Sequence, residues 1–150
     1  VLQEKKSFLG ICLGMQLVAK RGFEGGEHEG LGWLDAEVVP LRPSDPRHRI
    51  PHMGWNDTNV VRGEGLFREL ENPATFYYLH SFHLRPPERS SDWVSGTCSH
   101  GEEFVAAFEA GNLRGVQFHP EKSQGGGLTL LANFLRLSDA ARVAKEGVAA

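Results

Sequence analysis

The sequence predicts a single three-layer α/β domain built on an open sheet. Its 150 residues are too few for two ordinary domains, because compact domains typically contain about 100–150 residues. Apolar residues make up 40% of the chain and charged residues 23%, a balance that can bury a core. Short β-rich segments in the middle of the chain and helical patterns toward both ends are typical of an α/β layer architecture.

The first predicted elements are a strand and a helix. Residues 8–12 (FLGIC) form an apolar run that predicts a buried strand. Residues 13–22 (LGMQLVAKRG) predict a helix that Gly22 would cap at its C-terminal end. The next stretch, residues 22–32, contains five glycines and predicts a loop.

The rest of the chain predicts a sheet followed by a helix. Residues 34–41 predict a strand, and the four prolines between residues 40 and 51 predict a surface loop. Four further segments predict strands, and EAGN joins the last two as a hairpin turn: 75–82, 93–98, 103–108 and 113–118. After Gly127, apolar residues at helical spacing predict one buried helix face: Leu128, Leu131, Phe134 and Leu135.

Charge and composition exclude several classes of protein. The net charge of −3 and the lack of a dense basic stripe argue against binding to nucleic acid. No apolar run approaches the roughly 20 residues that span a bilayer, and the first residues do not resemble a signal peptide. Two cysteines cannot form a disulfide framework, so we expect a protein of the reducing cytoplasm.

Cys12 is the candidate nucleophile. It is the central residue of Gly10-Ile11-Cys12-Leu13-Gly14, at a predicted strand-to-helix turn, which is the cysteine counterpart of the nucleophile elbow. Such a turn strains the backbone, needs small neighbours and places the sulfur at a helix N-terminus that favours thiolate. The alternative is a buried structural cysteine. Cys98 lacks this setting, and we interpret it as structural.

His119 is the candidate general base. It ends an apolar strand, where open α/β sheets place their chemistry, and Pro120 stops that strand. Glu121 is close enough along the chain to orient the imidazole, although a solvated glutamate beside a strand-terminal histidine is the alternative. His80 and His83 have H-x-x-H spacing, but four convergent ligands are lacking, so we expect no metal site.

Together these segments resemble the class I (triad) glutamine amidotransferases. Within that family the chain is most similar to the glutaminase subunits of imidazole glycerol phosphate synthases. The resemblance covers about residues 7–137. The motifs that carry it are GICLGMQL (10–17), EGLGWL (29–34), PHMGWN (51–56), YLHSF (78–82) and GVQFHPEKS (115–123).

The resemblance implies a flavodoxin-like fold, no cofactor and a role for each matching residue. Cys12 would attack the side-chain amide of L-glutamine to form a thioester, His119 would carry the proton, and Glu121 would orient His119. Gln16 would hold the amino-acid end of the substrate, and the backbone N–H of Leu13 would be one oxyanion donor. The ammonia would pass to a partner (β/α)8-barrel synthase subunit in a heterodimer of histidine biosynthesis.

The same resemblance suggests which residues contact that barrel. Lys122 follows the triad glutamate and suits a cation aimed at acidic groups of the partner. Trp55, in PHMGWN, suits an apolar anchor, with a core tryptophan as the alternative. Tyr77 or Tyr78 could serve in a similar way.

The family pattern begins with a strand, a helix and a glycine-rich oxyanion loop that do not precede residue 8 here. We therefore expect an N-terminally truncated single domain over residues 1–150, with residues 8–11 paired on one edge only. Unpaired backbone groups and exposed apolar faces would make the isolated chain poorly soluble and inactive toward glutamine.

Three other functions stay open from the sequence. One is the glutaminase domain of another class I amidotransferase, which HMGWN argues against. A second is a catalytically inactive module that only binds a partner. The third is a cysteine peptidase, although Gln16 and HPEKS do not suggest a peptide groove.

Overall fold

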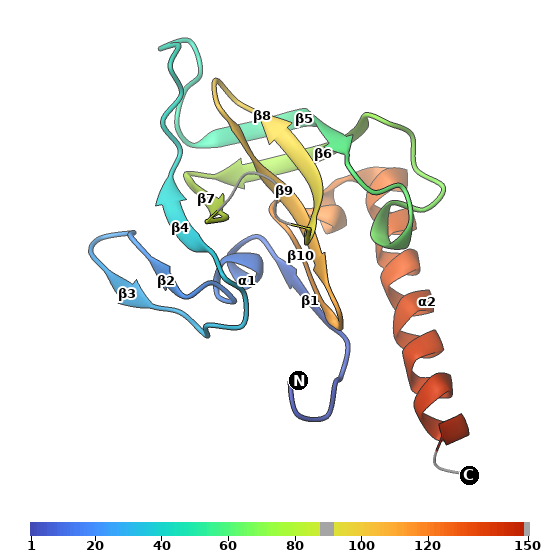
Figure 1. Cartoon of the computed structure of the whole chain (residues 1–150). Helices are drawn as coiled ribbons and strands as arrows, with labels where there is room; N and C mark the ends of the chain where they lie inside the picture. The colour runs from blue at the N-terminus through green and yellow to red at the C-terminus, as the bar shows by residue number, and fades with distance from the viewer. Residues whose placement is uncertain (88–91, 149–150) are drawn as a thin grey trace.

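Figure 1 shows the computed structural model, which describes residues 1–87 and 92–148. In this part of the chain, a six-stranded sheet has the order β1-β10-β9-β8-β5-β6 and a four-stranded sheet the order β3-β2-β4-β7. The strands are β1 (Phe8–Ile11), β2 (Arg21–Gly22), β3 (His28–Glu29), β4 (Glu37–Pro40), β5 (His52–Val60), β6 (Ala74–His80), β7 (Phe82–Arg85), β8 (Val94–Ser99), β9 (Glu103–Ala110) and β10 (Leu113–Val116). The helices are α1 (Leu13–Gln16) and α2 (Gln124–Val148), with 3-10 turns at Gly65–Phe67 and Pro120–Lys122.

The elements form three layers, as the sequence predicts. Helix α2 covers one face of the six-stranded sheet, where an aromatic core includes Phe67, Phe76 and Phe118. On the other face, the four-stranded sheet and α1 enclose a second core that contains Met15 and Phe108. The α/β class is confirmed, and the second outer layer is mainly a small sheet rather than helices.

The six-stranded sheet curls, so that its two edge strands approach each other. Just beyond β10, the backbone N–H of Gln117 donates to the Ala106 carbonyl of β9 at 2.8 Å. Two residues later, the N–H of His119 donates to the Tyr77 carbonyl of β6, also at 2.8 Å. The chain therefore crosses from the β9 side of the sheet to β6, at the opposite edge from β1.

The predicted open edge at residues 8–11 is confirmed within the described residues. Strand β1 pairs only with β10, in parallel, with Phe8 opposite Leu113 and Ile11 opposite Val116. The N–H groups of Phe8 and Cys12 point toward β10, where they donate to Asn112 and Val116. Because N–H groups alternate along a strand, those of Leu9 and Ile11 point away from the sheet.

The predicted helix over residues 13–22 is wrong beyond its first turn. Helix α1 ends at Gln16, and Gly22 lies in β2 instead of capping a helix. The carbonyl groups of Val18 and Ala19, which a longer helix would use internally, accept N–H groups from residues 32–34 instead. The predicted loop 22–32 therefore folds back on this segment and contributes β3.

The sequence analysis did not predict strands β2, β3 and β5, and the bounds of the predicted strands differ from those in the structure, most of all at 34–41 and 75–82. Strand β5 contains Gly54, Asn56 and Asp57, which are poor strand formers, and one of its faces is exposed. The predicted strand 34–41 is shortened to β4. The predicted strand 75–82 divides at Ser81 into β6 and β7.

Helix α2 turns a different face to the core than its sequence predicts. Leu130, Phe134 and Leu137 pack against the aromatic core, whereas Leu128 and Leu135 are 68% and 62% exposed. The predicted helix is confirmed, but its predicted apolar stripe is displaced around the helix axis. The chain after residue 137 extends this helix to Val148, and none of the described helices is long and apolar enough to cross a membrane.

Candidate active site

Cys12 lies in a strained turn between β1 and α1, as a nucleophile elbow requires. Its φ is 51°, a left-handed conformation that residues with a side chain rarely adopt. A Cβ on Gly10 would lie 2.4 Å from the Gly14 carbonyl oxygen, so Gly10 must be glycine for the turn to close. A Cβ on Gly14 would meet nothing within 4 Å, and the expected crowding at that glycine is therefore absent.

The Cys12 thiol is half-buried between β6 and the end of β10. Its S–H donates to the Leu79 carbonyl at 3.6 Å, and Gln117 Nε2 donates to the sulfur at 3.6 Å. Burial raises the pKa of the thiol, and this outweighs the hydrogen bonds from the Leu13 N–H and Gln117, which lower it. The Leu13 N–H at the start of α1 thus favours the thiolate, as the sequence predicts, but burial has the larger effect on the pKa of the thiol.

His119 and Glu121 form the predicted pair. The Nδ1 of His119 lies 2.7 Å from Oε1 of Glu121, and a carboxylate oxygen can only accept, so Nδ1 carries the proton. In the neutral ring the other nitrogen, Nε2, carries no proton and can accept one. The alternative of a solvated glutamate without contact to the imidazole does not hold in this structure.

Ser123 fixes the backbone of His119 to β6, a contact that the sequence analysis missed. The N–H of Tyr77 donates to Ser123 Oγ at 2.9 Å, and that hydroxyl donates to the His119 carbonyl at 2.6 Å. With the bond from the His119 N–H to the Tyr77 carbonyl, the three residues close a ring of hydrogen bonds. Ser123 is the last residue of the HPEKS motif and is 2% exposed, but its sequence setting does not identify the partner.

Cys12 and His119 both hydrogen-bond to β6, although Cys12 follows β1 and His119 follows β10. The Cys12 thiol binds the carbonyl of Leu79 and the His119 N–H binds that of Tyr77. These carbonyls are two residues apart on β6 and therefore about 7 Å apart. Glu121 and Lys122 act electrostatically on the thiol, which also places this turn beside Cys12. The structure thus brings together the three predicted triad residues.

The two predicted substrate-binding groups lie beside the nucleophile but already have partners. The N–H of Leu13 hydrogen-bonds to the Cys12 sulfur, so an oxyanion would have to compete for it. Gln16 turns its Nε2 inward, where it donates to the Phe82 carbonyl and to Gln117 Oε1, each at 3.0 Å. The Gln16 side chain is therefore tied to the protein itself through its NH2 end.

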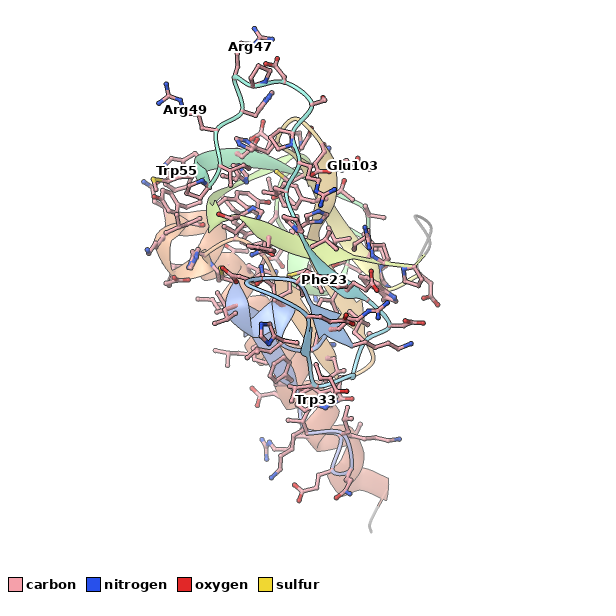
Figure 2. The ribbon with its side chains drawn as sticks, turned by 90° about the vertical axis from the view of Figure 1, so that its left-hand side faces the viewer. Phe23, Trp33, Arg47, Arg49, Trp55 and Glu103 are labelled. Atoms are coloured by element: carbon pink, nitrogen blue, oxygen red, sulfur yellow. The ribbon has the colours of Figure 1, made fainter. Side chains whose placement is uncertain are left out.

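The three predicted interface residues form one row, in which Trp55 and Lys122 are exposed and Tyr77 is half-buried. Trp55 of β5 lies opposite Tyr77 of β6, with ring centroids 6.0 Å apart, and Lys122 Nζ lies 5.8 Å from the Tyr77 ring centroid. Trp55 is 49% exposed, so it is not a core tryptophan, and Figure 2 shows it projecting from the side of the molecule. Tyr78, the other candidate, is fully buried and cannot contact a partner.

The buried histidines His52 and His80 and the second cysteine are structural in character. The described residues contain no group of three or more His, Cys, Asp or Glu side chains arranged to hold a metal ion. His52 and His80 are buried and hydrogen-bonded to each other at 2.9 Å. Cys98 is fully buried, and burial raises the pKa of its thiol to about 11.

Comparison with known proteins identifies the family. Residues 1–137 match the family described as "Glutamine amidotransferase class-I". The chain is 45% identical over 137 residues to the imidazole glycerol phosphate synthase subunit HisH 1 of Campylobacter jejuni, covering 91% of this chain and 66% of that protein. It is 48% identical over 128 residues to subunit HisH of Caulobacter vibrioides, covering 85% of this chain and 59% of that protein.

Solved structures support the fold. A GMP synthase-like protein from Thermoplasma acidophilum matches with a TM-score of 0.66 and 20% identity, covering 93% of this chain and 61% of that one. A glutamine amidotransferase from Thermotoga maritima matches with a TM-score of 0.58 and 21% identity, covering 97% and 52%. The fold is thus the flavodoxin-like one of these enzymes, and the chain spans about two thirds or less of the length of its relatives.

Proposed function

Because the chain belongs to the class I glutamine amidotransferase family, we propose that it acts in the glutaminase subunit of an imidazole glycerol phosphate synthase. The observation that carries this proposal is that Cys12 and the His119–Glu121 pair are held at neighbouring carbonyl groups of the same strand, β6. The relatives named HisH, at 45–48% identity, favour this enzyme over other glutaminases of the family. We place it in the cytoplasm, where its two free cysteines would stay reduced.

In the first step of the proposed reaction, Cys12 attacks the side-chain amide carbon of glutamine. Its raised pKa means that the thiol is neutral at rest, so a base must take the proton as the sulfur–carbon bond forms. His119 Nε2 is that base, and Glu121 stabilises the resulting imidazolium through Nδ1. The Leu13 N–H, released from the sulfur, donates to the oxyanion.

The tetrahedral intermediate then collapses. The carbon–nitrogen bond breaks, the imidazolium of His119 gives its proton to the leaving nitrogen, and ammonia departs from a γ-glutamyl thioester on Cys12. Water, deprotonated by His119, attacks the thioester and releases glutamate and the thiol. The ammonia passes to the (β/α)8-barrel synthase subunit.

The proposed division of labour is tested by Cys12→Ala in the whole protein with its barrel partner. The variant should lose glutamine-dependent synthesis and keep synthesis driven by added ammonium salt, because the barrel uses free ammonia. Cys98→Ala is the matched control and should keep both activities. Equal loss of both activities in Cys12→Ala would contradict the proposal.

We also propose that the row formed by Trp55, Tyr77 and Lys122 contacts the barrel. An aromatic pair with one exposed ring and a cation at its end suits a partner surface that carries acidic groups. Lys122→Ala should weaken partner-stimulated glutaminase activity more than basal activity. Lys20→Ala, which removes an exposed lysine paired with Asp35, is the control. Normal stimulation and normal complex stability in Lys122→Ala would refute the assignment.

A further inference from the structure

A buried carboxamide lies directly behind the proposed nucleophile. Gln117 follows β10 and is 0% exposed. Burying a primary amide is unfavourable unless its polar atoms are hydrogen-bonded. The Nε2 of Gln117 donates to the sulfur of Cys12 at 3.6 Å, and its Oε1 accepts from Gln16 Nε2 at 3.0 Å. Both ends of this side chain are therefore used by residues of the active site.

The orientation of the Gln117 amide is determined by its neighbours. The Phe82 carbonyl can only accept, so it selects the NH2 end of the Gln16 amide, 3.0 Å away. The same NH2 group then meets the oxygen of Gln117. This leaves the NH2 end of Gln117 facing Cys12, so that the sulfur receives a hydrogen-bond donor rather than an acceptor.

The Phe82 carbonyl also accepts a hydrogen bond from a buried histidine, which is bonded in turn to a second one. It accepts from His80 Nδ1 at 2.8 Å, so His80 Nε2 must accept from His52 Nδ1 at 2.9 Å. His52 Nε2 then accepts from Asn56 Nδ2 at 3.1 Å. Burial lowers the pKa of His80 to about 4 and that of His52 to about 3, so both rings are neutral at pH 7 and each has one N–H to donate.

We propose that Gln117 is a positioning residue that directs an N–H at the Cys12 sulfur and favours its thiolate, and that Gln16 fixes Gln117 in this orientation. A hydrogen bond to an ionised acceptor is roughly twice as strong as one to a neutral acceptor, so this N–H stabilises thiolate more than thiol. Gln117 would thus partly offset the burial that raises the pKa of Cys12. This inference rests on the proposed function, in which Cys12 is the nucleophile.

The competing interpretation is that Gln117 is an ordinary core amide. Its removal would then lower stability without changing the ionisation of Cys12. The charged groups that act on the thiol, Glu121 and Lys122, stay in place in every variant below. A shift in the ionisation of the thiol therefore separates the two interpretations.

The test measures the rate of iodoacetamide alkylation at Cys12 against pH, with the site located by mass spectrometry of the whole protein. Gln117→Leu should raise the midpoint of the Cys12 alkylation profile by about one pH unit. At a fixed pH below the midpoint, the fraction of thiolate would then be about tenfold lower. Gln117→Glu should move it further, because a carboxylate repels thiolate. Cys98 is an internal control, since it is buried and should stay unmodified.

Asn133→Leu is the matched control variant. It also removes a buried amide, one that donates to the carbonyls of Leu66 and Arg68 away from Cys12. It should lower the melting temperature and leave the Cys12 midpoint unchanged. If Gln117→Leu does not fold, Gln16→Leu takes its place, because releasing the Gln117 amide should raise the midpoint as well.

An unchanged midpoint in Gln117→Leu, or in Gln16→Leu where that variant replaces it, would overturn the proposal. Alkylation does not require glutamine turnover, so this result is independent of the proposed function. A shifted midpoint in a protein whose Cys12→Ala variant still hydrolyses glutamine would reject the function and keep the role of Gln117 toward the thiol.

Discussion

The two edge strands of the six-stranded sheet differ in whether other residues cover their outer edges. The outer edge of β6 is covered by residues 119–123. These residues hydrogen-bond to both the N–H and the carbonyl of Tyr77. The outer edge of β1 has no strand against it in the described part of the chain. The covered edge carries the proposed base and the open edge ends in the proposed nucleophile. The active site therefore depends on the curl of the sheet, which brings the two edges together.

The largest effect should come from the base at the covered edge. Glu121→Gln keeps the size of the side chain but removes the charge that stabilises the His119 imidazolium. We expect turnover of glutamine to fall by about 10²–10⁴ with little change in KM. Steady-state kinetics of the whole protein with its partner would measure this. A change confined to KM would make Glu121 a substrate-binding residue.

Amide hydrogen exchange compares the two edges directly. In the 150-residue chain, the N–H of Ile11 points away from β10, whereas that of Tyr77 is bound to Ser123 Oγ. We expect the Ile11 amide to exchange about a hundredfold faster than that of Tyr77. Equal protection at the two positions would show that another chain, or a second copy of this one, covers β1.

Removing the Ser123 hydroxyl, which links the backbone of His119 to β6, should destabilise the fold. Ser123→Ala leaves the Tyr77 N–H and the His119 carbonyl without this partner, which should destabilise the fold by about 2 kcal/mol. Chemical denaturation would measure the loss. Ser138→Ala, which removes a hydroxyl of α2 bonded to the Phe134 carbonyl, should change stability much less. Equal losses of stability in the two variants would mean that the Ser123 contact with β6 contributes no more than the Ser138 hydroxyl on α2.

The last prediction concerns the histidines behind the site. The pKa values of His52 and His80 are lowered from 6.5 to about 3 and about 4, so the unfolded chain binds more protons than the native one below pH 6.5. The free energy of unfolding should therefore be highest above pH 6.5. As the pH drops from 6.5 toward the lowered pKa values, it should fall by about 1.4 kcal/mol per pH unit for each ring.

Denaturation between pH 7 and pH 5 measures this slope. His52→Gln should reduce it, whereas His28→Gln, at an exposed position of β3, should not. An unchanged slope in His52→Gln would show that these rings do not control the acid sensitivity of the fold.

The contrast between the edges also explains what the sequence could predict. The elbow at Cys12, the pair of His119 with Glu121 and most strands depend on neighbours in the chain, and local patterns found them. The bond from Gln117 to Cys12 and that from Tyr77 to Ser123 join residues 105 and 46 positions apart, and no local pattern encodes such partners. Helical spacing predicted α2, but not that Leu130 rather than Leu128 faces the core, because the neighbouring layers decide which face is buried.

The most direct test of the nucleophile is to trap it. The whole protein with its proposed barrel partner is treated with 6-diazo-5-oxo-L-norleucine, a glutamine analogue that alkylates nucleophiles within glutamine sites. The modified peptide is located by mass spectrometry. We predict a single adduct on Cys12 that excess glutamine prevents, with Cys98 unmodified. An unmodified Cys12 in a protein that still hydrolyses glutamine would contradict the assignment of Cys12 as the nucleophile.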